Sequence, residues 1–289
     1  MREPLKLFVL GSCRVHRPIR LLQEQGRALL CTAGIPGYIH STREARQRLR
    51  WLSEGQGLDR QLLPFLFARS VLPRLEETHR RELAQADVVV IEAAAERSVE
   101  VDGVFLQKNL VVRHLVRELG EPGMQWWRGL IRSGSVHPDD YARAMGEYRQ
   151  LAEPALLASG ERVLRRARCA LDSEQAVRDD LQYAARLIGK PVVAVTHVDL
   201  PRPDGRLMVS RSQHVARVKA AAAALPGVHV IDPLDCARDM TREQVLDRDG
   251  EDLNHYCPAF EAVLAEHLHQ QLHAAARIGS RKSPTHSES

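Results

Sequence analysis

The sequence predicts an α/β fold in which a five-stranded parallel sheet lies between two layers of helices. Short apolar segments bounded by turn residues alternate with long segments rich in Arg, Ala, Leu and Glu, the pattern of strands alternating with helices. One apolar segment, residues 87–91, is a run of β-branched residues typical of a strand buried on both faces. A chain of 289 residues that is 44% hydrophobic can also bury a substantial core.

Five segments are expected to form the strands of this sheet, and turn residues mark the ends of several helices. The predicted strands are residues 5–10, 28–32, 87–91, 191–196 and 228–231. A helix is expected over residues 17–25, with Pro18 in its first turn, and a final helix over residues 258–278. Another helix should begin after His40, with Ser41 or Thr42 as its N-cap and Glu44 completing a capping box.

Residues 104–187 form the longest stretch without a predicted strand. Their pattern is helical almost throughout and is too long for an ordinary crossover, so a helical insertion is expected between the third and fourth strands. The whole of residues 1–278 is predicted to be one domain, and the polar residues 279–289 a disordered tail.

Charge and hydropathy argue against two classes of partner. The net charge is only +4, and no basic stripe interleaved with aromatic residues is present, which argues against nucleic-acid binding. The N-terminal apolar run is too short for a signal peptide or a membrane span, and no later uncharged stretch is long enough. The sequence therefore predicts a cytoplasmic, bacterial-type protein without a membrane partner, and it does not indicate an oligomeric state.

The five cysteines are scattered, odd in number and without a C-x-x-C pair: Cys13, Cys31, Cys169, Cys236 and Cys257. This pattern argues against a disulfide framework and against a structural zinc site. No other clustered Cys/His spacing and no glycine-rich nucleotide motif occurs, so we expect neither a metal nor a cofactor. Most of the thiols should be small buried hydrophobic groups, but one could be a nucleophile.

Cys13 is the candidate nucleophile because of its position after the first predicted strand. Ligands bind beyond the carboxyl ends of strands in open parallel sheets, and the turn Gly11-Ser12-Cys13 lies at such an end. A thiol there has its pKa lowered by a following helix N-terminus and by cations such as Arg14. The alternative for Cys13 is a buried thiol at the end of a strand.

Asp252 and His255 form the second candidate element, in a polar loop that precedes the final helix. Their spacing allows one short turn to place the carboxylate against the imidazole, which fixes its tautomer and stabilises the imidazolium. Together, Cys13, His255 and Asp252 are predicted to form a catalytic triad of nucleophile, base and orienting acid. The alternative is a loop aspartate beside a solvated histidine.

These motifs resemble those of the SGNH/GDSL hydrolase superfamily, in which a G-D-S turn carries the nucleophile and a late D-x-x-H completes the triad. In register, Gly11 matches the glycine, Ser12 the aspartate and Cys13 the serine. A G-S-C turn also occurs in outlying branches of the superfamily, including proteins linked to bacterial capsule polysaccharide synthesis. The resemblance implies an SGNH or flavodoxin-like fold, and an esterase or acyltransferase that forms a covalent intermediate on Cys13.

The resemblance also implies further oxyanion- and substrate-binding residues. The glycine after strand two would be Gly37 or Gly34, whose backbone N–H would hold the oxyanion with that of Cys13. Glu96 falls nearest the family's oxyanion asparagine, where a carboxylate cannot donate unless it is protonated. The other expected members of the site are Ser12, Arg14, His40 beyond strand two, and Arg211 beyond strand four, which could bind an anionic group. Surface or solvated roles are the alternatives for His40 and Arg211.

Three functions are open at this point. The first is an enzyme acting on a small acyl ester or an acylated carbohydrate, a substrate class taken from family analogy alone. The second is a non-catalytic SGNH-like scaffold that binds a ligand or partner. The third is a nucleotide-binding protein that uses the Gly11 turn for phosphate.

Overall fold

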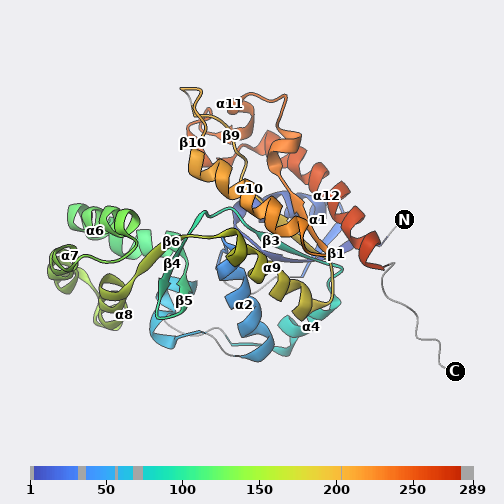
Figure 1. The fold of residues 1–289 in the computed structure, drawn as a ribbon. Helices are drawn as coiled ribbons and strands as arrows, with labels where there is room; N and C mark the ends of the chain where they lie inside the picture. The colour runs from blue at the N-terminus through green and yellow to red at the C-terminus, as the bar shows by residue number, and fades with distance from the viewer. Residues whose placement is uncertain (1–2, 32–36, 56–57, 68–73, 203, 281–289) are drawn as a thin grey trace.

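A five-stranded parallel sheet with strand order β2-β1-β3-β7-β8 forms the centre of the protein (Figure 1). The structure is a computed structural model that describes residues 3–31, 37–55, 58–67, 74–202 and 204–280. Helices flank the sheet, so the predicted α/β class with a five-stranded parallel sheet is confirmed. The central strands are β1 (Leu5–Leu10), β2 (Ala28–Leu30), β3 (Val88–Glu92), β7 (Val192–Val195) and β8 (Val228–Ile231).

Four of the central strands, β1, β3, β7 and β8, contribute residues to two hydrophobic cores, one on each face of the sheet. In β1, Phe8 and Leu10 belong to the first core, and Leu7 and Val9 to the second. This alternation follows from the two-residue period of a strand and explains why helices are needed on both faces. The first core is covered by α2 (Thr42–Glu54), α9 (Glu174–Ile188) and α10 (Val209–Ala223), and the second by α1 (Cys13–Glu24) and α12 (Pro258–Ser280).

An arm projects from one side of the central sheet (Figure 1). In the chain, its residues follow β3 and precede β7. The predicted insertion between the third and fourth strands of the central sheet is confirmed, and most of its residues are helical. It also contains an antiparallel sheet of order β5-β4-β6, so the expectation that it lacks strands was wrong. Residues 97–100 of β4 pair with residues 168–171 of β6, and such distant pairing leaves no local pattern in the sequence. The arm comprises β4 (Arg97–Val101), β5 (Val104–Leu106), α5 (Lys108–Val111), the π-helix η2 (Val112–Arg117), α6 (Gly120–Ser133), α7 (Pro138–Leu151), α8 (Pro154–Arg166) and β6 (Arg168–Leu171).

The polar segment before α12 is an antiparallel hairpin rather than the expected loop. It joins β9 (Leu246–Asp247) to β10 (Asp252–Tyr256), and the pairing is irregular between Asp252 and Tyr256. The last described helix reaches Ser280, and the rest of the predicted tail lies outside the described residues. The remaining elements are η1 (Arg60–Leu62), α3 (Pro64–Phe67), α4 (Glu77–Gln85), η3 (Pro233–Cys236) and α11 (Arg242–Val245).

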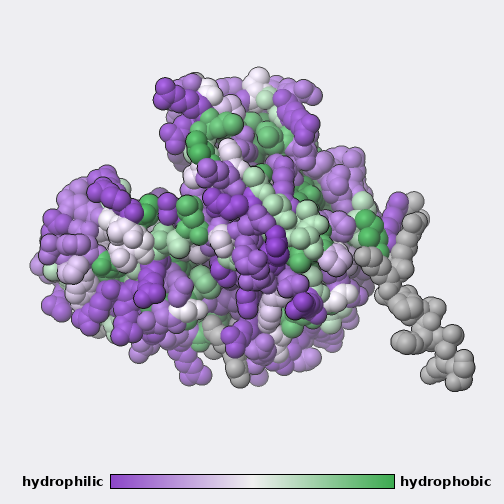
Figure 2. Space-filling model, viewed as in Figure 1, coloured by the Kyte–Doolittle hydropathy of each residue, from purple (hydrophilic) through white to green (hydrophobic). Residues whose placement is uncertain are grey.

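Polar side chains dominate the face of the molecule drawn in Figure 2, including the outer surface of the arm. Within the described ranges, none of the helices is both long enough and apolar enough to cross a bilayer.

Candidate functional site at the carboxyl edge of the sheet

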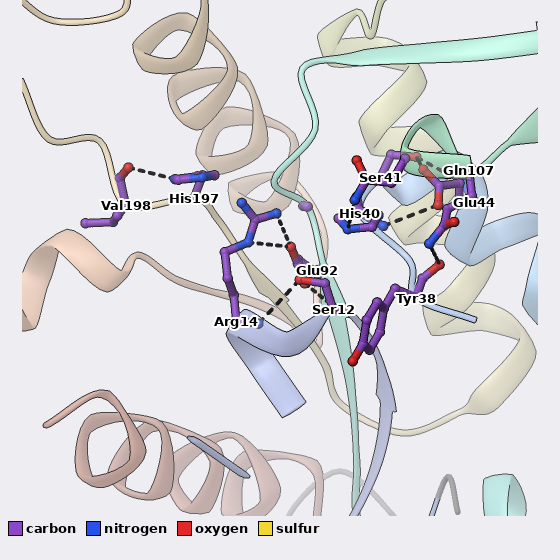
Figure 3. A network of polar contacts seen from close by, with 12 residues as sticks. Ser12, Arg14, Tyr38, His40, Ser41, Glu44, Glu92, Gln107, His197 and Val198 are labelled. Carbon is purple, nitrogen blue, oxygen red and sulfur yellow. Dashed lines mark hydrogen bonds and ion pairs between the residues drawn. The ribbon is translucent and has the colours of Figure 1, made fainter. Parts of the chain in front are cut away.

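Polar side chains from five separate segments meet where the central strands end at their carboxyl side. We refer to this group as the carboxyl-edge site, and Figure 3 shows most of it. Its members follow β1, β2 and β7, end β3, or begin α10: Ser12, Arg14, His40, Glu92, His197 and Arg211. This is the edge at which open parallel sheets bind ligands.

Helix α1 begins at Cys13, immediately after β1, and not at Arg17 as expected. Ser12 is its N-cap: its carbonyl accepts the N–H of His16 at 2.9 Å, and its side chain accepts the N–H of Arg14. An N-cap serine provides partners for the first N–H groups of a helix, so the helix can start directly after the strand. Pro18 consequently lies inside the helix rather than in its first turn.

Glu92, the last residue of β3, anchors the turn that follows β1, and sequence reasoning missed it. Its side chain is 1% exposed; Oε2 accepts the Ser12 N–H at 2.5 Å, and Oε1 pairs with Arg14 Nη2 at 2.5 Å. Burial alone would raise the pKa of Glu92, but Arg14, His40 and the bonds from Ser12 outweigh it and lower the pKa. The N–H of Ser12 is therefore engaged by Glu92. In the sequence, the signal that could have identified Glu92 is a carboxylate placed directly after an apolar strand.

Glu96, which the sequence favoured instead, lies beyond the end of β3 and is half-buried. Its backbone carbonyl accepts the N–H of Asp172 at 3.0 Å, which ties it to the end of β6. No hydrogen bond among the described residues joins its side chain to the turn after β1, so its expected role at the oxyanion stays untested.

His40 is held beside the ends of β1 and β3 by its own backbone. Its carbonyl accepts the N–H groups of Ala94 and Ala95 at 3.0 and 2.7 Å. The side-chain amide of Asn109 lies 3.3 Å from His40 Nε2, and the buried Nδ1 has no partner among the described residues. Because burial lowers the pKa of His40, the neutral ring accepts from Asn109 and keeps a donor at Nδ1.

The segments on either side of His40 contain the predicted cap of α2 and the predicted oxyanion glycine. Ser41 is the N-cap of α2, and its hydroxyl oxygen accepts the N–H of Glu44 at 3.2 Å, so the predicted cap is confirmed. Among the described residues, the Glu44 carboxylate accepts the N–H of His40 at 3.4 Å instead of that of Ser41, so the predicted capping box does not form. Burial raises the pKa of Glu44 to about 8. Gly37 is exposed and has a φ of 91°, a conformation that favours glycine, but no contact assigns it to an oxyanion. Gly34 lies outside the described residues.

His197 follows β7 and is only 3% exposed. Its Nδ1 lies 2.8 Å from the carbonyl oxygen of Val198, and its Nε2 has no partner in the described part of the chain. A carbonyl can only accept, so Nδ1 carries the proton and Nε2 is an acceptor. Burial, followed by the charges of Arg14 and Arg211, lowers the pKa of His197 well below its usual value.

Arg211 reaches the same place from the first turn of α10. Its Nη1 lies 3.5 Å from the Val198 carbonyl, and its side chain is partly buried. Burial and the nearby charge of Arg14 lower the pKa of Arg211 to about 10, so it remains a cation at neutral pH. The structure thus places the sequence-predicted Arg14, His40 and Arg211 at one edge of the sheet, together with His197 at the end of β7. It adds Glu92, which the sequence did not single out.

Asp252 and His255 contact one another as their spacing indicates. Asp252 Oδ2 lies 2.9 Å from His255 Nδ1, and the side chains are 18% and 46% exposed. Burial alone would raise the pKa of Asp252, but bonds from the Asn254 N–H and from His255 lower it. The carboxylate therefore stays ionised and orients an accessible imidazole.

Cys13 is partly buried at the start of α1, close enough to Arg14 and Arg17 for its charge to affect their pKa values. Helix α1 and strand β10 are in contact, but no hydrogen bond in the described residues joins Cys13 to His255. The structure therefore does not show a triad, and the catalytic roles of Cys13, Asp252 and His255 stay predictions. Among the described residues, no cluster of three His, Cys, Asp or Glu could hold a metal ion.

Unpartnered polar atoms are concentrated at the same edge. Native structures pair the great majority of buried polar groups, so each exception calls for an explanation. Six of the buried side-chain atoms that lack a partner belong to the segments after β2, β5 and β7 or to α10: His40 Nδ1, Gln107 Oε1, Thr196 Oγ1, His197 Nε2, Asp199 Oδ1 and His214 Nδ1. They include both donors and acceptors.

A surface hollow of about 610 Å³ lies elsewhere, near the start of β1 and the end of α12. Its lining includes Arg27, His269 and Arg277, and Arg27 is already paired with Glu266 at 2.7 Å. We place the candidate site at the carboxyl edge because the unpartnered buried groups are there.

The chain belongs to the family described as the TviD N-terminal domain, whose family model matches residues 5–271. It is similar to the Vi polysaccharide biosynthesis protein TviD of Salmonella typhi, with 25% identity over 270 residues. The alignment covers 90% of this chain but 30% of the relative, so the chain spans less than a third of that protein's length.

This family match overturns the resemblance to SGNH/GDSL hydrolases, which was wrong. The predicted esterase or acyltransferase with a covalent intermediate on Cys13 falls with it, as does the alternative of a non-catalytic SGNH-like scaffold. The resemblance depended on a three-residue turn and a D-x-x-H spacing. A strand–turn–helix junction and a polar hairpin produce such short patterns in unrelated proteins.

Proposed function

We propose that this chain is an enzyme of polysaccharide biosynthesis that binds a saccharide at the carboxyl edge of its sheet. Membership of the TviD N-terminal domain family and similarity to a polysaccharide biosynthesis protein support the pathway. We infer the ligand class from the buried donors and acceptors that have no partner at this edge among the described residues.

A saccharide suits these groups because each of its hydroxyls can both donate and accept. Neutral imidazoles, a hydroxyl and an amide oxygen recover the free energy lost on burial when a ligand hydroxyl completes their hydrogen bonds. The arrangement supplies both a donor at His40 Nδ1 and an acceptor at His197 Nε2. Such convergent polar groups are what fix a small ligand's orientation.

In the proposed reaction, His255 takes a proton from one saccharide hydroxyl. Asp252 receives the Nδ1–H of His255, so Nε2 is left as the base, and the carboxylate stabilises the imidazolium that forms. Cys13 is the third predicted member of this group, on the adjoining helix α1.

The test is genetic complementation in the organism of origin. A strain lacking this chain would receive the wild type, His255→Ala, Asp252→Asn or, as a matched histidine control on α12, His267→Ala. Polysaccharide yield and structure would be measured by NMR of the purified polymer, with immunoblots for protein level. We expect the control to restore the polymer and the two site variants to restore less than about a tenth of it, as loss of a general base typically costs a hundredfold or more.

Two outcomes would contradict the proposal. One is a deletion strain that makes the same polymer in the same amount as the parent. The other is full restoration by His255→Ala at normal protein level.

A further inference from the structure

We propose that His197 and Arg211 form a subsite for an acidic saccharide: a ligand hydroxyl donates to His197 Nε2, and a neighbouring carboxylate or phosphate binds Arg211. This inference rests on the proposed function and names the class of saccharide that the carboxyl-edge site takes.

The acceptor is fixed by the protein itself. The carbonyl of Val198 receives the proton of His197 Nδ1 at 2.8 Å, so the ring cannot present a donor at Nε2 while it is neutral. Nε2 is buried without a partner, and Figure 3 shows the guanidinium of Arg14 between the imidazole and Glu92. A ligand O–H would supply the missing donor.

The surroundings keep this ring neutral. The charged groups that act on it are Arg14, from α1, and Arg211, from α10, while His214 adds a third basic neighbour. All three disfavour a second proton on His197, and burial acts in the same direction. His197 is thus a permanent acceptor at physiological pH, unlike an exposed histidine.

The two arginines differ in what holds them. Arg14 is bound through Nε and Nη2 to Glu92 Oε1, at 3.0 and 2.5 Å. Arg211 has no carboxylate within ion-pair distance among the described residues; Asp199 and Glu96 act on it only through longer-range attraction. A partly buried guanidinium without a carboxylate partner gains more binding free energy from an added oxyanion than one that is already paired. It can bind the oxyanion with two parallel hydrogen bonds.

The start of α10 favours the same charge. Its N-cap, Met208, makes no side-chain capping bond, and its first turn contains no acidic residue. The positive end of this helix dipole therefore adds to the charge of Arg211, on the third residue of the helix.

The experiment is an NMR titration of the purified chain with glucose, glucuronate and glucose 1-phosphate, following the His197 imidazole signals. The variants are Arg211→Gln, His197→Phe and, as a control, Arg206→Gln in the exposed segment before α10. We expect at least one anionic probe to bind about tenfold or more tightly than glucose, as a charge-assisted pair provides. Arg211→Gln should remove that difference, His197→Phe should weaken all three probes, and Arg206→Gln should change nothing.

The two anionic probes separate the sources of the oxyanion, since glucuronate carries a carboxylate and glucose 1-phosphate a phosphate. The proposal is overturned if no probe shifts the imidazole signals at up to about 10 mM. It is also overturned if Arg211→Gln binds the anions like the wild type. Should His197→Phe not fold, His197→Gln, which keeps an acceptor oxygen, is expected to retain part of the affinity.

Failure here is distinguishable from failure of the proposed function. If Arg211→Gln leaves binding unchanged while His255→Ala abolishes the polymer, only the acidic subsite is wrong. If Arg211→Gln abolishes anion binding while His255→Ala makes normal polymer, the subsite stands without the proposed reaction.

Discussion

At the scale of single residues, the buried pair of Arg14 and Glu92 determines how the turn after β1 is held. Glu92 accepts hydrogen bonds from the backbone N–H of Ser12 and from the side chain of Arg14. One carboxylate therefore holds both the N-terminus of α1 and the Arg14 guanidinium in place. A pair of this kind is costly to break rather than strongly stabilising overall, because removal of one partner leaves a buried charge uncompensated.

We therefore predict that Glu92→Gln lowers the free energy of unfolding by about 3 kcal/mol, as measured by urea denaturation. The variant leaves the guanidinium of Arg14 without its counter-ion. Arg14→Gln is the matched control, and the double variant should be less unstable than the sum of the two single changes. A loss under about 0.5 kcal/mol for Glu92→Gln would show that the pair does not hold the turn.

A second residue-scale prediction concerns the reactivity of the free thiols. Burial raises the pKa of Cys31 and Cys169, and raises that of Cys236 to about 11, so these thiols should react slowly. Cys13 lies partly exposed at the start of α1, where a reagent in solution can reach it.

We expect iodoacetamide to label Cys13 at least about tenfold faster than these three thiols at neutral pH, as followed by peptide mass spectrometry. His255→Ala should slow labelling at Cys13 if the two residues act together. Equal rates at Cys13 and Cys31 would exclude a reactive thiol at Cys13.

At the scale of elements, the arm is held by close packing of α7 against α8. Tyr148 of α7 lies against Gly160 of α8, and a methyl group added at Gly160 would come within 2.4 Å of three Tyr148 ring and hydroxyl atoms. The Tyr148 hydroxyl also donates to the Leu156 carbonyl at 2.9 Å, so the ring cannot move without losing that bond.

Gly160→Ala should consequently destabilise the protein by about 1–3 kcal/mol, with hydrogen exchange increased in α7 and α8. Gly146→Ala is the control, because the space beside Gly146 on α7 is open and alanine favours a helix. We expect that control to be neutral or to stabilise by up to about 1 kcal/mol. Thermal unfolding of both variants tests the difference, and equal stabilities would contradict the packing argument.

At the scale of the whole molecule, the pH dependence of stability should reflect partly buried acids such as Glu44. Burial raises the pKa of Glu44 from 4.5 to about 8, so between these values the folded chain holds a proton that the unfolded chain has lost. The free energy of unfolding must then fall as the pH rises through this window, the reverse of an ion-paired carboxylate.

Glu44→Gln imitates the protonated acid and should reduce this decline. Between pH 6.5 and 8, we expect the wild type to lose about 1.5 kcal/mol more than the variant, at about 1.4 kcal/mol per pH unit for one proton. Denaturation at the two pH values measures the difference. Parallel pH profiles for the two proteins would show that Glu44 is ionised in the folded state.

The amino-acid sequence determined the features that depend on neighbours along the chain. The alternation of apolar segments with helical ones fixed the five central strands, since strands buried on both faces leave continuous apolar runs. Ser41 caps α2, and Asp252 meets His255, because each pair of interacting groups lies within three or four residues. The sequence motifs did not identify the family, because a three-residue turn and the D-x-x-H spacing are too short to be specific.

Only the tertiary structure decided the contacts between distant segments. The arm's β4 and β6 pair across some seventy residues, so their short sequences showed no strand period of their own. Glu92 and Arg14 are 78 positions apart, and His197 comes near Arg14 and Arg211 because β1, β3 and β7 end at one edge. The composition of the candidate site follows from strand order, which local sequence patterns do not encode.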